Sequence, residues 1–265
     1  MPALRDPAAI RSILAADPAW SVCALGDLAP GFFEHSEWFQ PPDGTPALVL
    51  LYRGFSTPVL FAIGEPAAVA SMLDEIRCEP ALYLHVRSEI VPLLATHFRI
   101  VELKEMLRMV LDPLGYRPAP TEGAARLAAA DLGELERLFA DGNATGEAPD
   151  FFLPSMLRDG VFFGIREAGE LVAAAGTHLA VPAEGVGVVG NVYTRRDRRG
   201  QGLAARTTSA VVGELLRINL RTIALNVSQN NEVAIRVYER LGFLRHCTYY
   251  EGLTAPGTPL PAGRG

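Results

Sequence analysis

The sequence predicts an α/β protein of the α+β kind, built from two domains that each combine a sheet with helices. Its 265 residues are enough for two ordinary domains with cores of their own. The second half has the order helix, three strands, helix, strand, helix, strand, and the first half echoes the later part of that order. Between the halves, "DPLGYRPAPT" at residues 112–121 carries three prolines and a glycine, a composition typical of a linker.

These signals divide the chain into four parts. We expect an N-terminal domain over residues 1–112, a linker over 113–121, a second domain over 122–253, and a disordered tail over 254–265. The tail is expected because "TAPGTPLPAGRG" is rich in proline and glycine.

Composition narrows the class of protein. Apolar residues make up 49% and charged residues 20%, as in globular proteins, and the net charge of −6 argues against a nucleic-acid partner. The three cysteines form no C-x-x-C pair and the histidines have no metal-ligand spacing, so we expect no metal. The start, "MPALRDPAAI", shows no signal peptide, and no apolar run reaches the ~20 residues that span a membrane. We therefore expect a cytoplasmic protein without a membrane partner.

The second half begins with a short amphipathic helix. Leucines at 132, 135 and 138 follow Asp131, which we expect to cap the helix. Two β-like runs over 160–180 are joined at "EAGE", where Gly169 predicts a hairpin turn, and "GVGVVGNVYT" over 185–194 predicts a third strand.

The rest of this half alternates helix and strand. Residues 202–218 carry an apolar stripe at helical spacing, and "TIALNV" over 222–227 reads as a strand. Residues 230–243 predict a helix that ends at Gly242, because glycine tolerates the left-handed conformation found just past helix ends. "FLRHCTYYEG" over 243–252 is the closing strand.

The first half shows strands and helices in a similar order. We expect strands over 46–52, 58–64, 81–86 and 98–111 and helices over 66–76 and 88–98. This order suggests tandem copies of one fold, the first of which has diverged. The turn of the first copy that matches the basic loop described next is "AIGEPAA", which is acidic and has one glycine.

The stretch "NVYTRRDRRGQGLAARTTSAVV" over 191–212 carries the clearest chemical signal. A strand ends at a turn with four arginines and two glycines, and a helix follows. The first N–H groups of a helix lack intrahelical partners, and the helix dipole adds positive potential, so such a turn can hold a pyrophosphate. No Walker A motif is present, and "GQGLAA" follows three strands and lacks the acidic residue that a dinucleotide site needs ~20 residues later.

This loop resembles the coenzyme A loop of the GNAT acetyltransferase superfamily, [QR]-x-x-G-x-[GA]. Gly200 and Gly202 occupy the two small positions, and Asp197 departs from the leading Gln/Arg. A second stretch, "LNVSQNNEVAIRVYERLGF", resembles the superfamily segment N-x-x-A-x-x-x-Y-x-x-x-G-F through Asn231, Ala234 and Tyr238 and the closing Gly-Phe pair. The resemblance covers residues 126–252, and the two-domain layout is similar to the glycine N-acyltransferase-like branch.

The resemblance implies a fold, a co-substrate and a site. The fold would be a mixed, mostly antiparallel sheet flanked by helices, preceded by a smaller degenerate GNAT-like N-terminal domain. Acetyl-CoA would bind to residues of the strand, the loop and the later helix: Val192, Tyr193, Thr194, Arg198, Arg199, Gly200, Gln201, Gly202, Leu203, Ala204, Asn231, Ala234 and Tyr238. The first three would pair through their backbone with pantetheine, and Arg195 or Arg196 is expected to be simply solvated.

Three residues are candidates for catalysis. Tyr238 would protonate the leaving thiol, and a packed helix tyrosine is the alternative reading. No acid stands on the 185–194 strand, where Asn191 could orient a water or a substrate group. His178 on the neighbouring strand has a suitable pKa for a base, although a hydrogen-bonded structural histidine is as common. Glu147 is a further loop acid that could face the acceptor.

Two functions remain open at this point. The first is an N-acyltransferase that moves an acetyl group from acetyl-CoA to a primary amine of a small molecule. The second is a non-catalytic acyl-CoA-binding sensor, because the strand acid is missing. A monomer and a homodimer are both compatible with the sequence.

Overall fold

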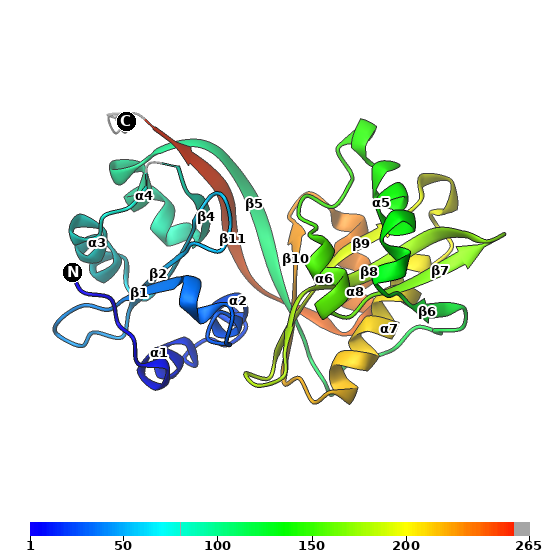
Figure 1. Ribbon diagram of the computed structural model, residues 1–265, viewed down its shortest axis with the longest axis horizontal. Coiled ribbons are helices and arrows are strands. Elements are labelled where there is room, and N and C mark those ends of the chain that lie inside the picture. The colour runs from blue at the N-terminus through cyan, green and yellow to red at the C-terminus, as the bar shows by residue number, and fades with distance from the viewer. Residues whose placement is uncertain (80, 257–265) are drawn as a thin grey trace. The chain divides into compact units, whose positions relative to one another are not determined.

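A computed structural model of the protein describes residues 1–79 and 81–256 (Figure 1). The chain forms two units. Unit 1 comprises residues 1–108 together with the chain from His246 onward, and unit 2 comprises Met109–Arg245. Two long strands, β5 (Arg99–Leu111) and β11 (Phe243–Ala255), each contribute residues to both units.

Unit 2 contains the predicted succession of elements. Its strands and helices are β6 (Ala124–Arg126), α5 (Leu132–Ala140), α6 (Pro154–Asp159), β7 (Phe163–Glu167), β8 (Glu170–Val181), β9 (Val186–Thr194), α7 (Leu203–Arg217), β10 (Thr222–Ser228) and α8 (Glu232–Leu241). The strand order is β10-β9-β8-β7-β6, with β5 on the far side of β10.

The sheet of unit 2 is mostly antiparallel. Strands β6 to β9 pair antiparallel with their neighbours, and β10 alone runs parallel to β9. The apolar side chains of α5 and α6 pack with Ala174 and Tyr193 on one face. On the other face, Leu203 of α7 packs with Val172 and Ala173. A mixed sheet flanked by helices, as predicted, is therefore confirmed.

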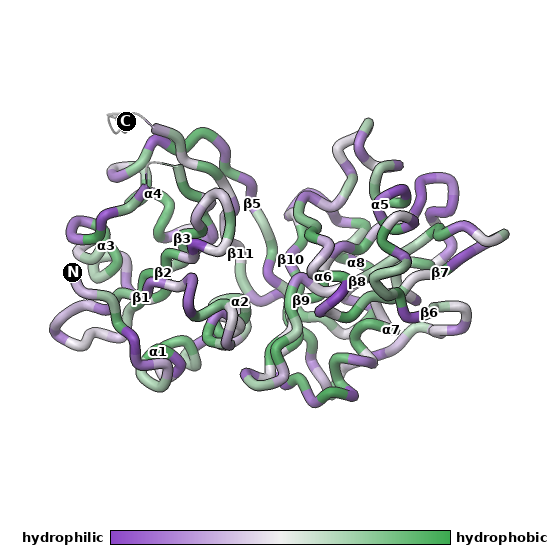
Figure 2. Tube along the Cα trace, in the orientation of Figure 1, coloured by the Kyte–Doolittle hydropathy of each residue, from purple (hydrophilic) through white to green (hydrophobic). Residues whose placement is uncertain are grey.

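Unit 1 repeats part of this order. Its elements are α1 (Pro7–Leu14), α2 (Val22–Gly26), β1 (Ser36–Phe39), β2 (Leu48–Tyr52), β3 (Val59–Ile63), α3 (Pro66–Glu75), β4 (Tyr83–Arg87) and α4 (Val91–His97). The strand order is β1-β2-β3-β4-β11-β5. Strands β3 and β4 are parallel, as β9 and β10 are, and each parallel pair is connected by a helix. All five residues of β2 are buried, and hydrophobic stretches follow the strands of both units (Figure 2).

Both units also contain short 3-10 helices. They are η1 (Phe33–His35), η2 (Ser88–Ile90), η3 (Ala129–Asp131), η4 (Asn143–Thr145) and η5 (Arg196–Arg198). Asp131 is the N-cap residue of α5, as predicted, but its side chain makes no capping hydrogen bond to that helix. Its carboxylate instead accepts the N–H of Ala128, 2.7 Å away, and closes η3.

The predicted division into 1–112, 113–121 and 122–253 differs from the observed units. Residues 113–121 are not a free linker, because the Tyr116 hydroxyl donates to the Ser209 carbonyl at 3.1 Å and the Ala119 N–H donates to the Ser209 hydroxyl at 2.9 Å. The chain passes between the units inside β5 and β11 instead. A boundary that falls inside a β-strand has no proline or glycine to mark it in the sequence. The proline-rich segment "DPLGYRPAPT" is instead an irregular stretch that packs on α7.

The predicted tail begins too early. Thr254 and Ala255 belong to β11, and Thr254 exchanges two hydrogen bonds with Leu82, one through its N–H and one through its hydroxyl, each 2.9 Å long. Thr254 is 4% exposed, which contradicts a disordered start at residue 254. The remainder of the predicted tail, 257–265, lies outside the described residues.

Gly242 ends α8 in the left-handed conformation, with φ at +99°, and a Cβ atom there would lie 2.5 Å from the Gly115 carbonyl oxygen. We predict that Gly242→Ala lowers the free energy of unfolding by about 2 kcal/mol or more, because left-handed strain and this contact add. Gly213→Ala is the matched control. Gly213 lies exposed inside α7 with open space at its Cβ position, so alanine should stabilise the helix by up to about 1 kcal/mol. Urea denaturation followed by circular dichroism measures both, and equal effects would contradict the assignment.

Candidate active site

Strand β9 carries one extra residue where it passes β8. Gly190 faces Gly176 and Tyr193 faces Ala174, so three steps along β9 match two along β8. Asn191 lies in this bulge with φ at +52°, a conformation in which asparagine is tolerated better than most residues. A bulge changes the direction of a side chain and can end strand pairing. Asn191 is buried at this bulge, with 4% of its surface exposed.

The bulge coincides with the point at which β9 leaves β10. The two strands pair from Val186↔Thr222 to Val189↔Leu225, and no further pair follows although β9 continues to Thr194 and β10 to Ser228. The backbone of residues 190–194 is therefore not paired with β10. An unpaired strand edge of this kind offers N–H and C=O groups to an extended ligand.

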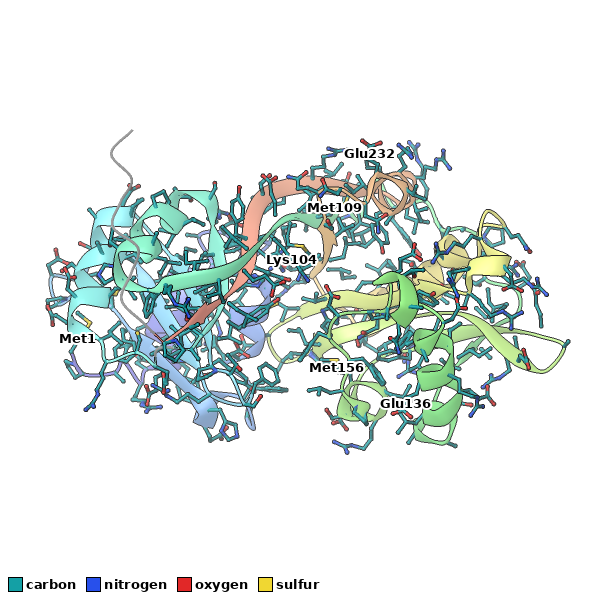
Figure 3. The ribbon with its side chains drawn as sticks, turned by 90° about the horizontal axis from the view of Figure 1, so that it is seen from above. Met1, Lys104, Met109, Glu136, Met156 and Glu232 are labelled. Atoms are coloured by element: carbon teal, nitrogen blue, oxygen red, sulfur yellow. The ribbon has the colours of Figure 1, made fainter. Side chains whose placement is uncertain are left out.

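Polar side chains without partners lie along this separation. Among the described residues, Asn191 Oδ1, Thr194 Oγ1 and Asn226 Oδ1 are buried and have no hydrogen-bond partner. Asn191 Nδ2 makes a weak contact with Met156 Sδ at 3.7 Å. Met156 belongs to α6 and is labelled in Figure 3. Buried polar atoms are normally satisfied, so three orphans in one place fit a bound ligand with amide groups. Asn226 was not predicted; its signal is a polar residue inside the apolar strand "TIALNVS".

The loop after β9 presents backbone N–H groups. Gly200 and Gly202 have φ of +78° and +75°, and nothing lies within 4 Å of a Cβ atom at either position. Gly202 is the N-cap of α7, whose first intrahelical bond is from the Arg206 N–H to the Gly202 carbonyl. The N–H groups of Leu203 and Ala204 consequently have no acceptor within the helix. The donors and open space suit a diphosphate.

The loop arginines do not present a free positive field. All four guanidinium groups pair with carboxylates, and each has a partner outside the loop: Arg195 with Glu170 and the loop's own Asp197, Arg196 with Asp141, Arg198 with Glu167 and Asp197, and Arg199 with Glu147. The expectation that Arg195 or Arg196 is simply solvated is wrong for this reason. The anion-binding capacity of the loop consequently depends on its backbone more than on these side chains.

Asp141, at the end of α5, organises this loop and was not predicted. Its Oδ2 accepts from the Arg196 N–H at 3.0 Å and from the Tyr193 hydroxyl at 2.8 Å. These hydrogen bonds, led by that from the Arg196 backbone, hold the pKa of Asp141 below its usual range. The carboxylate thereby fixes the start of the loop to the buried end of β9. No short-range sequence pattern connects residues 141 and 196, so the signal is absent from the sequence.

Helix α8 positions the second predicted group of residues. Asn231 is the N-cap of α8, and its Oδ1 accepts the N–H of Ala234 at 3.1 Å. This capping contact gives a structural reason for the three-residue spacing between Asn231 and Ala234. Tyr238 is 7% exposed and its ring meets Phe243 edge-on at 6.1 Å. Burial raises the pKa of Tyr238 to about 12, so the hydroxyl keeps its proton at neutral pH.

His178 lies beside the bulge. His178 is an extra residue in β8 relative to β9, because Thr177 faces Val189 and Leu179 faces Val188, so two steps along β8 match one along β9. A Cβ atom on Gly190 would lie 2.3 Å from His178 Nε2, so the ring covers the residue that precedes Asn191. Phe151 meets the ring edge-on at 6.1 Å. The structure therefore brings His178 and Asn191 together.

Glu147 is engaged elsewhere. Its Oε1 accepts from Arg199 at 2.8 Å and its Oε2 from the Thr145 hydroxyl at 2.7 Å. The Arg199 hydrogen bond, followed by that of Thr145, lowers the pKa of Glu147, which makes this carboxylate a poorer base. It serves in this structure as a partner of the loop.

Among residues 1–79 and 81–256, no group of three or more His, Cys, Asp and Glu side chains could hold a metal ion. Within the same residues, no helix is both long and apolar enough to cross a bilayer.

The fold of unit 2 resembles that of known acetyltransferases. Residues 131–243 match the family model described as the acetyltransferase (GNAT) family, and these residues form most of unit 2. A GNAT-family structure from Novosphingobium aromaticivorans aligns with a TM-score of 0.59 at 25% identity, covering 79% of this chain and 89% of that one. Unit 2 therefore has the GNAT fold, and its residues 131–243 are similar to the GNAT family model.

Curated relatives match over a shorter length. The mycothiol acetyltransferase of Geodermatophilus obscurus is 35% identical over 89 residues, and that of Thermobispora bispora is 38% identical over 88 residues. Each match covers 32% of this chain, and the chain spans less than a third of the length of these relatives, 29% and 30% respectively. The similarity concerns one segment and not the whole protein.

We predict that Asp141→Asn lowers the melting temperature at pH 7. The pKa of Asp141 is depressed in the folded state, so its stabilisation is fully present above the unfolded pKa of about 3.9 and is lost as the pH falls through the folded value. The difference between variant and parent should accordingly shrink as the pH is lowered towards 3–4, as thermal scans at several pH values would show. Asp159→Asn is the control, because Asp159 pairs only with its exposed neighbour Arg158 and should change little.

Proposed function

We propose that unit 2 is an acyl-CoA-dependent N-acyltransferase, transferring an acetyl group from acetyl-CoA to a primary amine of a small molecule. The observation that carries the proposal is the separation of β9 from β10 at the Asn191 bulge, next to the glycine turn that opens α7. An unpaired strand edge and a cluster of helix N–H groups suit the two polar parts of coenzyme A, its pantetheine amides and its diphosphate. The names of the curated relatives support acetyl transfer.

The residues that would hold the co-substrate lie in three places. The backbone of Val192, Tyr193 and Thr194 would pair with pantetheine. The N–H groups from Gly200 to Ala204 would hold the diphosphate. Arg198 and Arg199 would add positive charge if their guanidinium groups exchanged their present carboxylate partners for the diphosphate. Ala234 is half-buried on α8 and would leave room for the thiol arm, with the amide of Asn231 nearby. When bound, acetyl-CoA supplies an acyl group activated as a thioester.

The side chains of unit 2 would move the protons. The Tyr238 hydroxyl is protonated at neutral pH, as any tyrosine is, and would donate a proton to the leaving thiol. Burial raises its pKa to about 12, so it would have to regain a proton promptly after each transfer. The amine must lose a proton, and no carboxylate stands on β9 to accept it. His178 is the nearest titratable group to Asn191 that the structure identifies on β8, and we propose it as the base, directly or through a water held by Asn191 Oδ1. The finer placement in a glycine N-acyltransferase-like branch stays a prediction.

We predict that Gly202→Val weakens coenzyme A binding about 100-fold, measured by isothermal titration calorimetry. Valine is strained at φ +75°, so the turn would shift and misplace the N–H groups that follow. Arg198→Ala should weaken binding by less than about tenfold, because its guanidinium already pairs with Glu167 and Asp197. Arg198→Ala weakening binding more than Gly202→Val would contradict a backbone site.

We predict that Tyr238→Phe leaves coenzyme A affinity unchanged and lowers turnover about 100-fold, since general acid catalysis contributes at least that much. Release of free thiol from acetyl-CoA with a panel of amines measures turnover, and titration calorimetry measures binding. Unchanged turnover would remove Tyr238 from the mechanism. Binding without transfer to any amine would favour the acyl-CoA sensor.

A further inference from the structure

Unit 1 contains a cavity of about 320 Å³ at the ends of two parallel strands. Strands β3 and β4 pair as far as Phe61↔His85, and both continue for two more residues. Ala62 and Ile63 line the cavity from β3, and Arg87 lines it from the end of β4. The carboxyl ends of parallel strands are a common location for ligand sites, and the volume is at the lower end of the range for small molecules.

The turn beside this cavity does not suit a phosphate. In the sequence Gly64-Glu65-Pro66, the proline lacks an N–H group and the glutamate places negative charge at the start of α3. Gly64 is explained by packing, because a Cβ atom there would lie 2.4 Å from Ala47 Cβ. The cavity therefore differs in chemistry from the glycine turn of unit 2.

Arg87 supplies the positive charge of the cavity. One of its terminal nitrogens, Nη2, pairs with Asp17, and the guanidinium lies 5.2 Å from the centre of the Trp20 ring. Its Nε is buried and has no hydrogen-bond partner among the described residues. Asp17 also accepts from the Trp20 N–H at 3.0 Å and contacts His246 at 2.8 Å, so its charge is shared among several groups. Because Nε is buried, a ligand carboxylate would meet the terminal nitrogens of the guanidinium, whose side chain is 29% exposed.

The other lining groups are acidic or apolar. Glu65 and Glu89 are exposed carboxylates at the cavity, one at the β3–α3 turn and the other just after β4. Pro46, Ala62 and Ile90 provide apolar wall. One cation, two anions and an apolar wall complement a molecule that carries a carboxylate, an ammonium group and a hydrocarbon chain.

We propose that this cavity binds a free α-amino acid with an apolar side chain. The ligand carboxylate would bind Arg87, its ammonium group would lie between Glu65 and Glu89, and its side chain would contact Ile63 and Ile90. Unit 1 would then be a small-molecule binding unit in its own right, independent of the acyl transfer proposed for unit 2.

Tryptophan fluorescence of the full chain tests the proposal. Both tryptophans, Trp20 and Trp38, belong to unit 1, and Trp20 lies against Arg87. L-leucine should change the emission saturably at micromolar to low millimolar concentration. 4-Methylpentanoate lacks the ammonium group and 3-methylbutylamine lacks the carboxylate, so each should bind at least about tenfold more weakly.

Variants connect the signal to the cavity. Glu89→Gln should weaken leucine about tenfold and leave 4-methylpentanoate unchanged, because only the ammonium contact is lost. Arg87→Met should weaken both ligands. Glu102→Gln is the matched control, an exposed acid of β5 in the same unit that does not line the cavity. Gly202→Val should retain the leucine response, which separates this site from the acyl-CoA site.

Three results would overturn the proposal. These are no emission change at tens of millimolar leucine, equal affinity for leucine and its two analogues, and an unchanged leucine affinity in Glu89→Gln. The last outcome is decisive even if Arg87→Met fails to fold. Glu89 is exposed, and the hydrogen bond that its carboxylate accepts from the Ser88 hydroxyl at 3.2 Å is a surface contact, so Glu89→Gln should fold normally.

Discussion

The single extra residue at Asn191 is the constraint on which the architecture of unit 2 depends. It lies where β9 stops pairing with β10, so the backbone of residues 190–194 is open to a ligand at the candidate site. Among the described residues, Asn191 Oδ1 at the bulge and Asn226 Oδ1 on β10 are buried without hydrogen-bond partners, which costs free energy. Such costs persist only where the surrounding structure holds them, and they are typical of functional sites. In unit 2 this surrounding structure consists of the apolar side chains of α5 and α6 on one face of the sheet and of α7 on the other.

A second constraint is electrostatic. The loop between β9 and α7 contains four arginines within an acidic protein, and each guanidinium is matched by a carboxylate from elsewhere in unit 2. Exposed pairs of this kind contribute little individually, but together they fix the path of the loop. Asp141 contributes most to this order because it also binds the buried Tyr193 hydroxyl. The arginines therefore shape the turn, and the glycines leave its backbone open to an anion.

Local sequence patterns identified most of the regular elements from residue 46 onward and missed the long-range contacts. They did not predict α1, α2 or β1. The stripe on α7, the hairpin at Gly169 and the stop at Gly242 are all present, because each depends on neighbours in sequence. The short α6 and the three-residue β6 were not predicted, since neither is long enough to show periodicity. The bulge was missed because register depends on the partner strand. Asn191 and His178 were identified as candidates, but their proximity required the fold.

The two units cannot be separated at the proline-rich segment, because each sheet includes a strand from the other half of the sequence. Residues 246–255 of β11 follow the last helix of unit 2, yet they pair with β4 of unit 1, from Tyr249↔Arg87 to Leu253↔Tyr83. A fragment ending near residue 112 would lose Tyr249, which is fully buried, and would expose the edge of β4. The parallel pairs β3–β4 and β9–β10 end at turns of different composition, one with Glu65 and Pro66 and the other with four arginines and two glycines. A shared strand order with different turn chemistry accords with the unlike ligands that we propose for the two units.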